Sequence, residues 1–202
     1  MSPHKGKKYP VETLTSEEVQ RLIKACSARS VSGSRNRAMI ITIHRSGLRL
    51  SEALDLRPKD LDLDNGAIRV LHGKGNKART IGVDATTCSI LAGWLDARKH
   101  LIDGVKPSDP VFCTLKCGRV DTSYIRKMFK RLAKKAGIEK RVHAHGLRHT
   151  HASELINEGV PLNEISGQLG HSSVATTHRY VNHVNPKQRI DRMRAREWSI
   201  DL

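Results

Sequence analysis

The sequence has no apolar stretch long enough to cross a lipid bilayer. Its most apolar stretch, Met39 to Ile43, is far shorter than the ~20 residues that a membrane-spanning helix requires. Residues 1–10 carry charges but no apolar segment of the kind found in secretory signals. We therefore expect a cytoplasmic protein that has no membrane partner.

Cysteine is also scarce, with Cys26, Cys88, Cys113 and Cys117 as its four residues. A reducing compartment keeps such thiols free, so we expect no disulfide framework. The Cys113-x3-Cys117 spacing lacks the second matching pair that zinc knuckles have. We interpret these two cysteines as small buried hydrophobic residues.

Acidic residues are few, with 20 Asp and Glu against 36 Lys and Arg, which gives a net charge of +16. The chain of 202 residues is 38% hydrophobic, enough for one globular domain, or for a domain with an appendage. Because the excess charge is spread over a chain that can fold, it favours a polyanionic partner. Nucleic acid is preferred to an anionic membrane surface.

The pattern of apolar and helix-ending residues predicts a mainly helical chain with one small sheet. Thr15-Ser16-Glu17-Glu18 has capping-box spacing, which begins a helix at Ser16 that ends near Ser27, before a loop rich in Ser, Arg and Gly. β-branched residues alternate in Ala67–Leu71 and Arg79–Val83, so Leu61–Val83 is expected to form an antiparallel sheet of two or three strands. Further helices are predicted at 36–46, 51–56, 84–103, 121–136, 146–158, 162–169, 173–183 and 186–197.

Basic charge is concentrated between Lys116 and Arg141, where ten Lys and Arg residues accompany only Asp121 and Glu139. A solvated helix face is the ordinary explanation of such a run. Here the charge has one sign, which favours contact with phosphates.

Arg49 stands between two leucines at a predicted helix junction, where a partly buried guanidinium needs an anionic partner such as Glu52. Lys74 lies in the glycine-rich tip of the predicted hairpin, which by itself is a common arrangement. His145 and His149 have the i, i+4 spacing of a helical metal site, but the glutamate of the H-E-x-x-H motif is missing and Gly146 weakens the helix. Tyr180 alone would be a core-edge residue.

Taken in order, these residues resemble the catalytic domain of the tyrosine recombinase (phage integrase) family from about Thr13 to about Val184. The motifs that carry the resemblance are G-L-R-x-S-E around Arg49, G-K-G-N-K around Lys74, H-x-L-R-H-T at His145 and Arg148, and L-G-H ending at His171, with Tyr180 nine residues beyond. The resemblance implies an α+β, mainly helical fold with a small antiparallel three-stranded sheet or hairpin packed on a helical core.

The resemblance also implies a role for each of these residues. Arg49 and Arg148, with Glu52 supporting Arg49, would stabilise the charge that develops on a phosphate under attack, as paired guanidiniums do. Tyr180 would be the nucleophile that forms a 3′-phosphotyrosyl link, which keeps the bond energy for religation, so that no ATP is needed. The fixed cations of the site would make a metal ion unnecessary. His145 would act as base, Lys74 would protonate the leaving 5′-oxygen, and His171 would donate a hydrogen bond to the phosphate.

The expected partner is double-stranded DNA, which a tetramer of protomers would bind at paired sites. Without DNA, the protomers are expected to associate weakly or to be monomeric. No cofactor and no small-molecule substrate are expected. Candidate contacts with the DNA backbone are Arg79, Arg119, Ser123, Arg126 and Lys130. The function implied is a site-specific recombinase or integrase of a phage or mobile element in a bacterial host cell. The alternatives are a DNA-relaxing enzyme of the type IB topoisomerase kind and a non-catalytic DNA-binding protein.

The domain organisation follows the same resemblance. Residues 1–12 are expected to be a basic tail or linker remnant, 13–184 the catalytic domain, and 185–202 a C-terminal helix or tail. That last segment docks either locally or on a neighbouring protomer. Larger family members carry an additional N-terminal domain that helps to enclose the duplex, and this sequence contains no counterpart. Either an excised catalytic domain or a natural short integrase explains the length.

Overall fold

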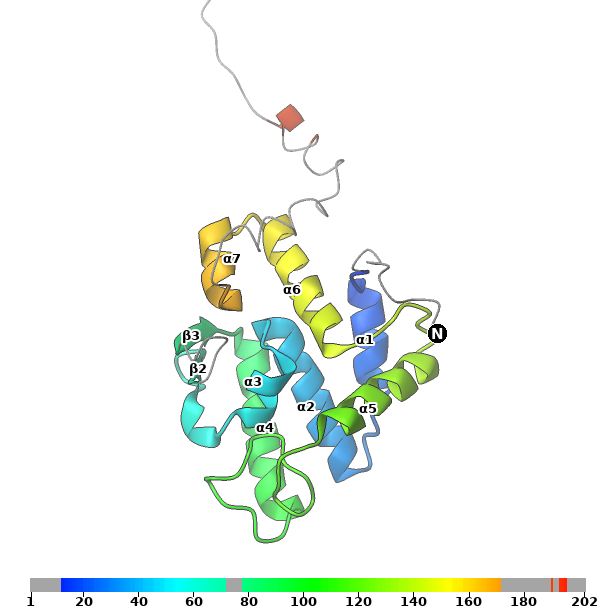
Figure 1. The fold of residues 1–202 in the computed structure, drawn as a ribbon, viewed down its shortest axis with the longest axis vertical. Helices are drawn as coiled ribbons and strands as arrows, with labels where there is room; N and C mark the ends of the chain where they lie inside the picture. The colour runs from blue at the N-terminus through cyan, green and yellow to red at the C-terminus, as the bar shows by residue number, and fades with distance from the viewer. Residues whose placement is uncertain (1–11, 72–77, 172–189, 191–192, 196–202) are drawn as a thin grey trace, which may run out of the picture.

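The computed structural model describes residues 12–71, 78–171, 190 and 193–195. The fold of these residues is α+β and mainly helical, as the resemblance implied (Figure 1). The elements in chain order are α1 (Ser16–Lys24), α2 (Val31–Ser46), α3 (Leu50–Asp55), a 3-10 helix (Pro58–Asp60), β1 (Leu61–Asp62), β2 (Ala67–Val70), β3 (Arg79–Gly82), α4 (Ala85–Leu101), α5 (Thr122–Lys135), α6 (Ala144–Glu158) and α7 (Leu162–Leu169).

Helix α2 is the central element of the core. It packs against α1, α3, α4 and α6, and its residues Met39, Ile40 and Ile43 are completely buried. Because α2 is covered on several sides, its apolar residues do not form a single stripe, unlike those of a surface helix. The main core continues through α4 and α5, and a small second cluster joins α6 to α7 through Ala152, Ile165 and Leu169.

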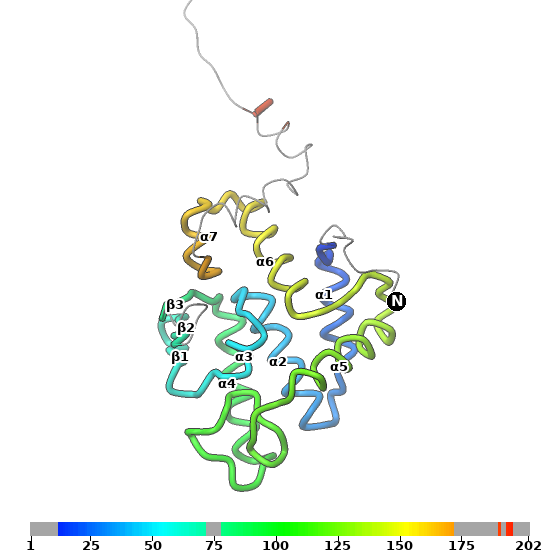
Figure 2. Tube along the Cα trace, viewed as in Figure 1, coloured from blue at the N-terminus to red at the C-terminus, as the bar shows by residue number. Residues whose placement is uncertain are grey.

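The sheet lies on the side of the helical core away from α1 and α5 (Figure 2). Its strands are antiparallel in the order β1-β2-β3, with Ile68 opposite Ile81 and Leu61 opposite Ile68. Ile68 and Ile81 are buried, and their neighbours Arg69 and Thr80 are exposed. This alternation is what the sequence predicted, because one face of the sheet covers the core.

Two predicted helix starts were wrong. Helix α2 begins at Val31, five residues before the predicted start, because the Ser30 hydroxyl accepts a hydrogen bond from the Gly33 N–H at 3.1 Å. Serine and glycine therefore cap and pack this helix start instead of forming a loop. Helix α6 begins at Ala144 and contains Gly146, which the sequence analysis expected to weaken the helix. The helices predicted at 173–183 and 186–197 lie outside the described residues, apart from residue 190 and residues 193–195.

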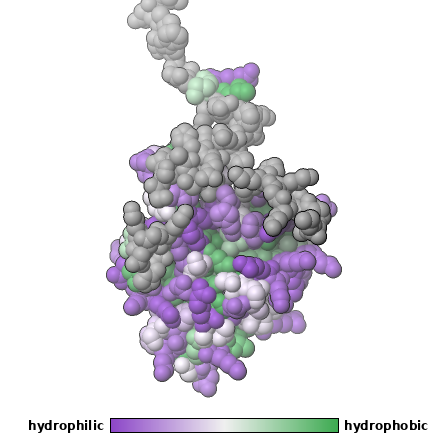
Figure 3. Space-filling model, in the orientation of Figure 1, coloured by the Kyte–Doolittle hydropathy of each residue, from purple (hydrophilic) through white to green (hydrophobic). Residues whose placement is uncertain are grey.

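Most of the surface that is coloured in Figure 3 is hydrophilic, with smaller hydrophobic patches between the polar side chains. Of the described helices, none combines the length and apolar character needed to cross a bilayer.

Candidate active site

A sharp turn after α2 places Arg49. Helix α2 ends at Gly47, whose φ of 67° is left-handed. A Cβ at Gly47 would lie 2.7 Å from carbons of His151 and of Leu169, so glycine is required for both conformation and space. The chain then leaves in an extended conformation at Arg49, immediately before α3. Close packing of this turn on α6 and α7 therefore fixes the backbone position of Arg49.

The Arg49 guanidinium is held from two sides. Its Nη1 donates to Glu52 Oε1 at 2.7 Å, and its Nη2 donates to the Gly170 carbonyl at 3.0 Å. About a quarter of the side chain, 26%, remains exposed. The partly buried arginine with a carboxylate partner is therefore confirmed, and Glu52 is that partner.

Arg148 of α6 is buried beside the same turn. Its Nη1 donates to the Gly47 carbonyl at 2.5 Å, and its Nη2 donates to the Leu169 carbonyl at 2.6 Å. Arg49 and Arg148 thus bind the carbonyls of consecutive residues at the end of α7. Two guanidiniums from distant parts of the sequence converge at one place.

Glu52 also binds a third arginine, Arg79 of β3. Arg79 donates from Nη1 to Oε1 and from Nη2 to Oε2, both at 2.9 Å. Burial alone would raise the pKa of Glu52, but the hydrogen bonds from Arg79 and Arg49 outweigh it and lower the pKa to about 2. Glu52 is therefore a carboxylate at every pH at which the protein would work.

His145 and His149 lie one turn apart on α6 and contact each other. Their Nε2 atoms are 2.9 Å apart, and the rings are close to perpendicular with centroids at 4.2 Å. Burial lowers the pKa of His145, and the positive charges of Arg148, His143 and Arg49 lower it further. A neutral imidazole at His145 is able to accept a proton.

His171 directly follows the left-handed Gly170 that ends α7, and its backbone N–H donates to the Ser166 carbonyl at 3.1 Å. Its side chain is half-buried. The structure therefore brings Arg49, Arg148 and His171 to the same end of α7. Lys74 and Tyr180 lie outside the described residues.

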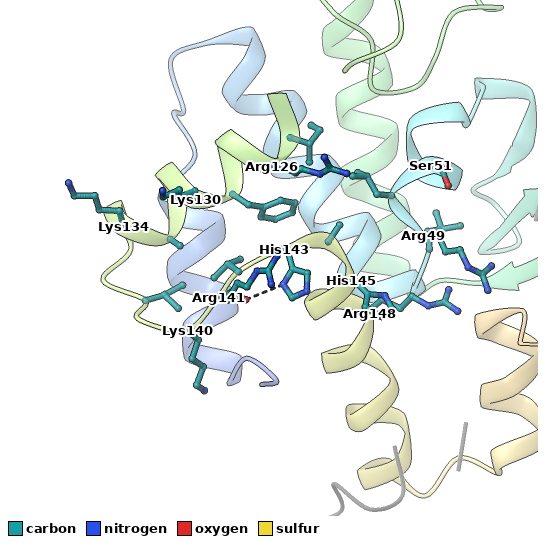
Figure 4. Close-up of a pocket in the computed structure, with 18 of the residues that line it drawn as sticks. Arg49, Ser51, Arg126, Lys130, Lys134, Lys140, Arg141, His143, His145 and Arg148 are labelled. Atoms are coloured by element: carbon teal, nitrogen blue, oxygen red, sulfur yellow. Dashed lines mark hydrogen bonds between the residues drawn. The ribbon is translucent and has the colours of Figure 1, made fainter. Parts of the chain in front are cut away.

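A groove of about 960 Å³ runs from this cluster to α5. Arg49, His145 and Arg148 line one part of it, as Figure 4 shows. Its apolar floor includes Leu48, Ile125, Phe129 and Val142. The lining also contains the basic residues Arg126, Lys130, Lys134, Lys140, Arg141 and His143, and one acidic residue, Glu139. Basic residues outnumber the single carboxylate, so the groove favours an anionic ligand.

The sequence matches a family model called the phage integrase family over residues 12–187. The chain belongs to this family. It is 36% identical over 180 residues to "Tyrosine recombinase XerC" of Lactobacillus leichmannii, a match that covers 88% of this chain and 60% of the relative.

Solved structures of recombinases share the fold. The XerA recombinase superposes with a TM-score of 0.79 at 33% identity, covering 95% of this chain and 68% of that one. The XerH site-specific recombinase bound to a palindromic difH substrate gives a TM-score of 0.73 at 32% identity, covering 91% of this chain and 52% of that one. The chain thus spans roughly half to two thirds of the length of these members of the phage integrase family.

The five residues predicted to contact the DNA backbone lie in different surroundings. Arg126 and Lys130 are exposed on α5 and line the groove, and Ser123 is exposed at the start of the same helix. Arg119 instead pairs with Asp55, with Nε and Oδ1 2.5 Å apart. Arg79 is only 13% exposed and forms its pair with Glu52, which leaves little of its side chain for a surface contact.

Sequence reasoning missed two contacts that hold the family motifs together. The second arginine on Glu52 comes from a strand that is distant in the sequence, and no local spacing indicates it. Gln168 was also missed. Its side-chain amide donates to the Gly82 carbonyl at 2.8 Å and accepts from the Gly82 N–H at 3.0 Å, which joins α7 to the edge of β3. No pattern of apolar residues marks such a contact.

Proposed function

We propose that this chain is the catalytic part of a site-specific DNA recombinase. The observation that carries the proposal is the convergence of two guanidiniums, Arg49 and Arg148, on the end of α7, beside His145 and His171. Negative charge grows on the nonbridging oxygens when a phosphodiester is attacked, and donors held in advance stabilise that charge. Family membership and recombinase relatives of similar fold support the same conclusion.

The reaction is a pair of transesterifications. The Tyr180 oxygen attacks the phosphorus, a new bond between phosphorus and the tyrosine oxygen forms, and the bond to the 5′-oxygen breaks. His145 takes the phenol proton, and Lys74 gives a proton to the leaving 5′-oxygen. A 5′-hydroxyl from another strand then attacks the phosphorus, the bond to the Tyr180 oxygen breaks, and the phosphodiester reforms, so that no ATP is consumed. Burial and the neighbouring positive charges lower the pKa of His145, which favours the neutral form that can accept this proton.

Double-stranded DNA is the proposed substrate, with α5 lying along it. Arg126, Lys130 and Lys134 extend along one side of the groove that ends at Arg49 and Arg148. A duplex whose scissile phosphate lies at these two arginines would place neighbouring phosphates against α5. Recombination joins two cleaved duplexes, so we propose a tetramer on paired sites and a monomer or weak association without DNA.

Covalent capture tests the chemistry and also finds a substrate. The protein is incubated in EDTA with a library of nicked duplexes made from random sequence, and DNA that remains attached in denaturant is sequenced. We expect an enriched site joined to protein through a 3′-phosphate. Tyr180→Phe removes the adduct, whereas the matched control Tyr124→Phe retains it. An adduct that survives Tyr180→Phe, or that EDTA abolishes, contradicts the mechanism.

The captured site then separates the alternatives. We propose that the biological outcome is integration of a phage or mobile element, which requires exchange between two site-bearing duplexes. A plasmid with one site and a labelled duplex with a second site should yield a joined product. Relaxation of supercoils without joined product favours the topoisomerase alternative, and binding without any adduct favours the non-catalytic one.

A further inference from the structure

We propose that Arg79 is a positioning residue that keeps the catalytic Arg49 available to the phosphate. This inference rests on the proposed function, because it concerns how the cleavage site is held. Arg79 does not line the groove, and its side chain is only 13% exposed. It acts through Glu52 and through the end of α7.

Glu52 is a buried carboxylate that receives two hydrogen bonds on each oxygen. Its side chain is 2% exposed. Oε1 accepts from Arg49 Nη1 at 2.7 Å and from Arg79 Nη1 at 2.9 Å. Oε2 accepts from the Arg49 backbone N–H at 2.8 Å and from Arg79 Nη2 at 2.9 Å. Arg79 thus gives Glu52 a complete two-pronged contact, which only a guanidinium supplies.

This contact limits the number of Arg49 guanidinium nitrogens that donate hydrogen bonds to the carboxylate. Glu52 engages Arg49 through one guanidinium nitrogen, Nη1, while Nη2 points to the Gly170 carbonyl. Without Arg79, the second carboxylate oxygen would lose its guanidinium donor and would attract Arg49 more strongly. Glu52 would then compete directly with the DNA phosphate for the same side chain.

The charge of the cluster leads to the same conclusion. Arg49, Glu52 and Arg79 together carry one net positive charge, whereas Arg49 and Glu52 alone carry none. A neutral pair in a partly buried site has little attraction for a phosphate, because the field of the carboxylate cancels that of the guanidinium. Arg79 therefore allows Arg49 to act as a cation.

The end of α7 ties all three arginines into one unit. The last carbonyls of a helix lack partners within the helix and form the negative end of its dipole. Here Arg79 Nε lies 3.5 Å from the Gln168 carbonyl, Arg148 Nη2 lies 2.6 Å from that of Leu169, and Arg49 Nη2 lies 3.0 Å from that of Gly170. Three consecutive carbonyls thus each receive a different arginine.

Gly170 provides the space that Arg79 occupies. A Cβ at this position would lie 2.7 Å from Arg79 Nε and 2.8 Å from its Cδ and Cζ. The glycine of the L-G-H motif is therefore required by the third arginine as well as by its own φ of 62°. This links the motif before His171 to the same cluster.

The test compares single-turnover cleavage of the captured nicked duplex by wild type, Arg79→Met and the matched control Arg69→Met. Arg69 lies on the neighbouring strand β2, is exposed, and donates to the Lys59 carbonyl. Methionine keeps the bulk of the stem and removes the charge and the donors. We expect Arg79→Met to lower the maximal rate by roughly 10- to 100-fold, as misplacement of a catalytic group does. The DNA concentration that gives half of the maximal rate should change no more in Arg79→Met than it does in Arg69→Met.

A second-site variant distinguishes positioning from general damage. Arg79→Met with Glu52→Gln removes the buried negative charge and restores one net positive charge to the cluster. We expect this double variant to cleave faster than Arg79→Met alone, and urea unfolding verifies that each variant is folded. If Arg79→Met does not fold, the double variant alone is tested, and we expect it to cleave the nicked duplex.

Three results would overturn the inference: an Arg79→Met protein that cleaves like Arg69→Met, a folded double variant that is no faster than a folded Arg79→Met, or, where only the double variant folds, its failure to cleave. Wild-type protein that forms no adduct would instead refute the proposed function itself.

Discussion

The absence of a side chain at Gly170 leaves the space that the Arg79 guanidinium occupies. Its left-handed φ of 62° is unfavourable for any residue with a side chain, and a Cβ would meet the Arg79 guanidinium at 2.7 to 2.8 Å. Gly137 has the same φ of 62° but no atom within 4 Å of its Cβ position. Comparing substitutions at these two glycines therefore separates the free-energy cost of the left-handed backbone conformation from that of the steric clash.

We predict that Gly137→Ala lowers the free energy of unfolding by about 1 kcal/mol, the cost of the left-handed conformation. Gly170→Ala should lose a further ~1–3 kcal/mol, because the extra methyl group displaces Arg79 or the end of α7. It should also slow cleavage, whereas Gly137→Ala should not. Urea unfolding and the covalent adduct assay measure these effects, and equal losses in the two variants would contradict the close contact at Gly170.

The buried carboxylate of Glu52 gives the protein a pH-dependent part of its stability. Its folded pKa is about 2 against an ordinary 4.5, so the stabilisation is complete above 4.5 and is lost as pH falls toward 2. A shift of this size corresponds to a stabilisation on the order of 3 kcal/mol. We predict that the difference in unfolding free energy between wild type and Glu52→Gln shrinks as pH falls from 5 to 3. A difference that stays constant over that interval would show that the carboxylate charge is not the cause.

Local contacts at the site could be predicted from sequence and distant ones could not. Glu52 was assigned to Arg49 because the two lie three residues apart at a helix start. The Arg79 contact spans 27 residues and the Gly170 contact spans 121, and only the folded chain brings those groups together. The family resemblance named Arg49, His145, Arg148 and His171, but it did not say how they are held.

At the scale of elements, capping residues predicted helix limits better than composition did. The Thr15 and Glu18 capping box begins α1 at Ser16 as expected, since both of its hydrogen bonds form. The start of α2 was misplaced because Ser, Gly and Arg resemble a loop by composition, although Ser30 is a cap. Glycine in α6 was tolerated because the helix is packed on α2 and α7, and tertiary contacts outweigh propensity.

Helix α5 is the element that we expect to contact the DNA backbone. Its residues Ile125, Met128, Phe129 and Leu132 are buried, which turns Arg126 and Lys130 outward to the groove. We predict that Lys130→Ala weakens duplex binding several-fold and lowers the slope of log affinity against log salt by about 1. Fluorescence anisotropy at several salt concentrations measures both.

The matched control for this prediction is Lys99→Ala. Lys99 is an exposed lysine of α4, 3.8 Å from Asp96, and does not line the groove. It carries the same charge as Lys130 and is likewise exposed on a helix. If Lys99→Ala weakens binding as much as Lys130→Ala does, α5 has no special place in the interface.

At the scale of the whole molecule, the net charge of +16 separates into two sets of residues. A few arginines are buried or paired around Glu52 and the end of α7. Many others are exposed, including those along α5. Under the proposed function, the exposed set would attract DNA of any sequence, while the buried set would hold and position the groups that act on one phosphate.

We predict a steep salt dependence for binding of duplex DNA that lacks a cleavage site. If the cationic wall of the groove contacts four or five phosphates, log affinity should fall with log salt at a slope of about −4. Titrations between 50 and 300 mM salt measure the slope. A slope near zero would mean that the basic groove does not bind the backbone.

The contacts of Arg49 and Arg148 with the end of α7 have a consequence for the order in which the site forms during protein synthesis. Arg148 reaches back 101 residues to Gly47, and Arg49 reaches forward 121 residues to Gly170. A ribosome releases the chain from its N-terminus, so Arg49 acquires the Gly170 carbonyl, and Arg148 the Leu169 carbonyl, only after the end of α7 has emerged. An incomplete chain therefore has DNA-attracting charge but no assembled phosphate site. Under the proposed function, a chain that ends before α7 would therefore attract DNA without being able to cleave it.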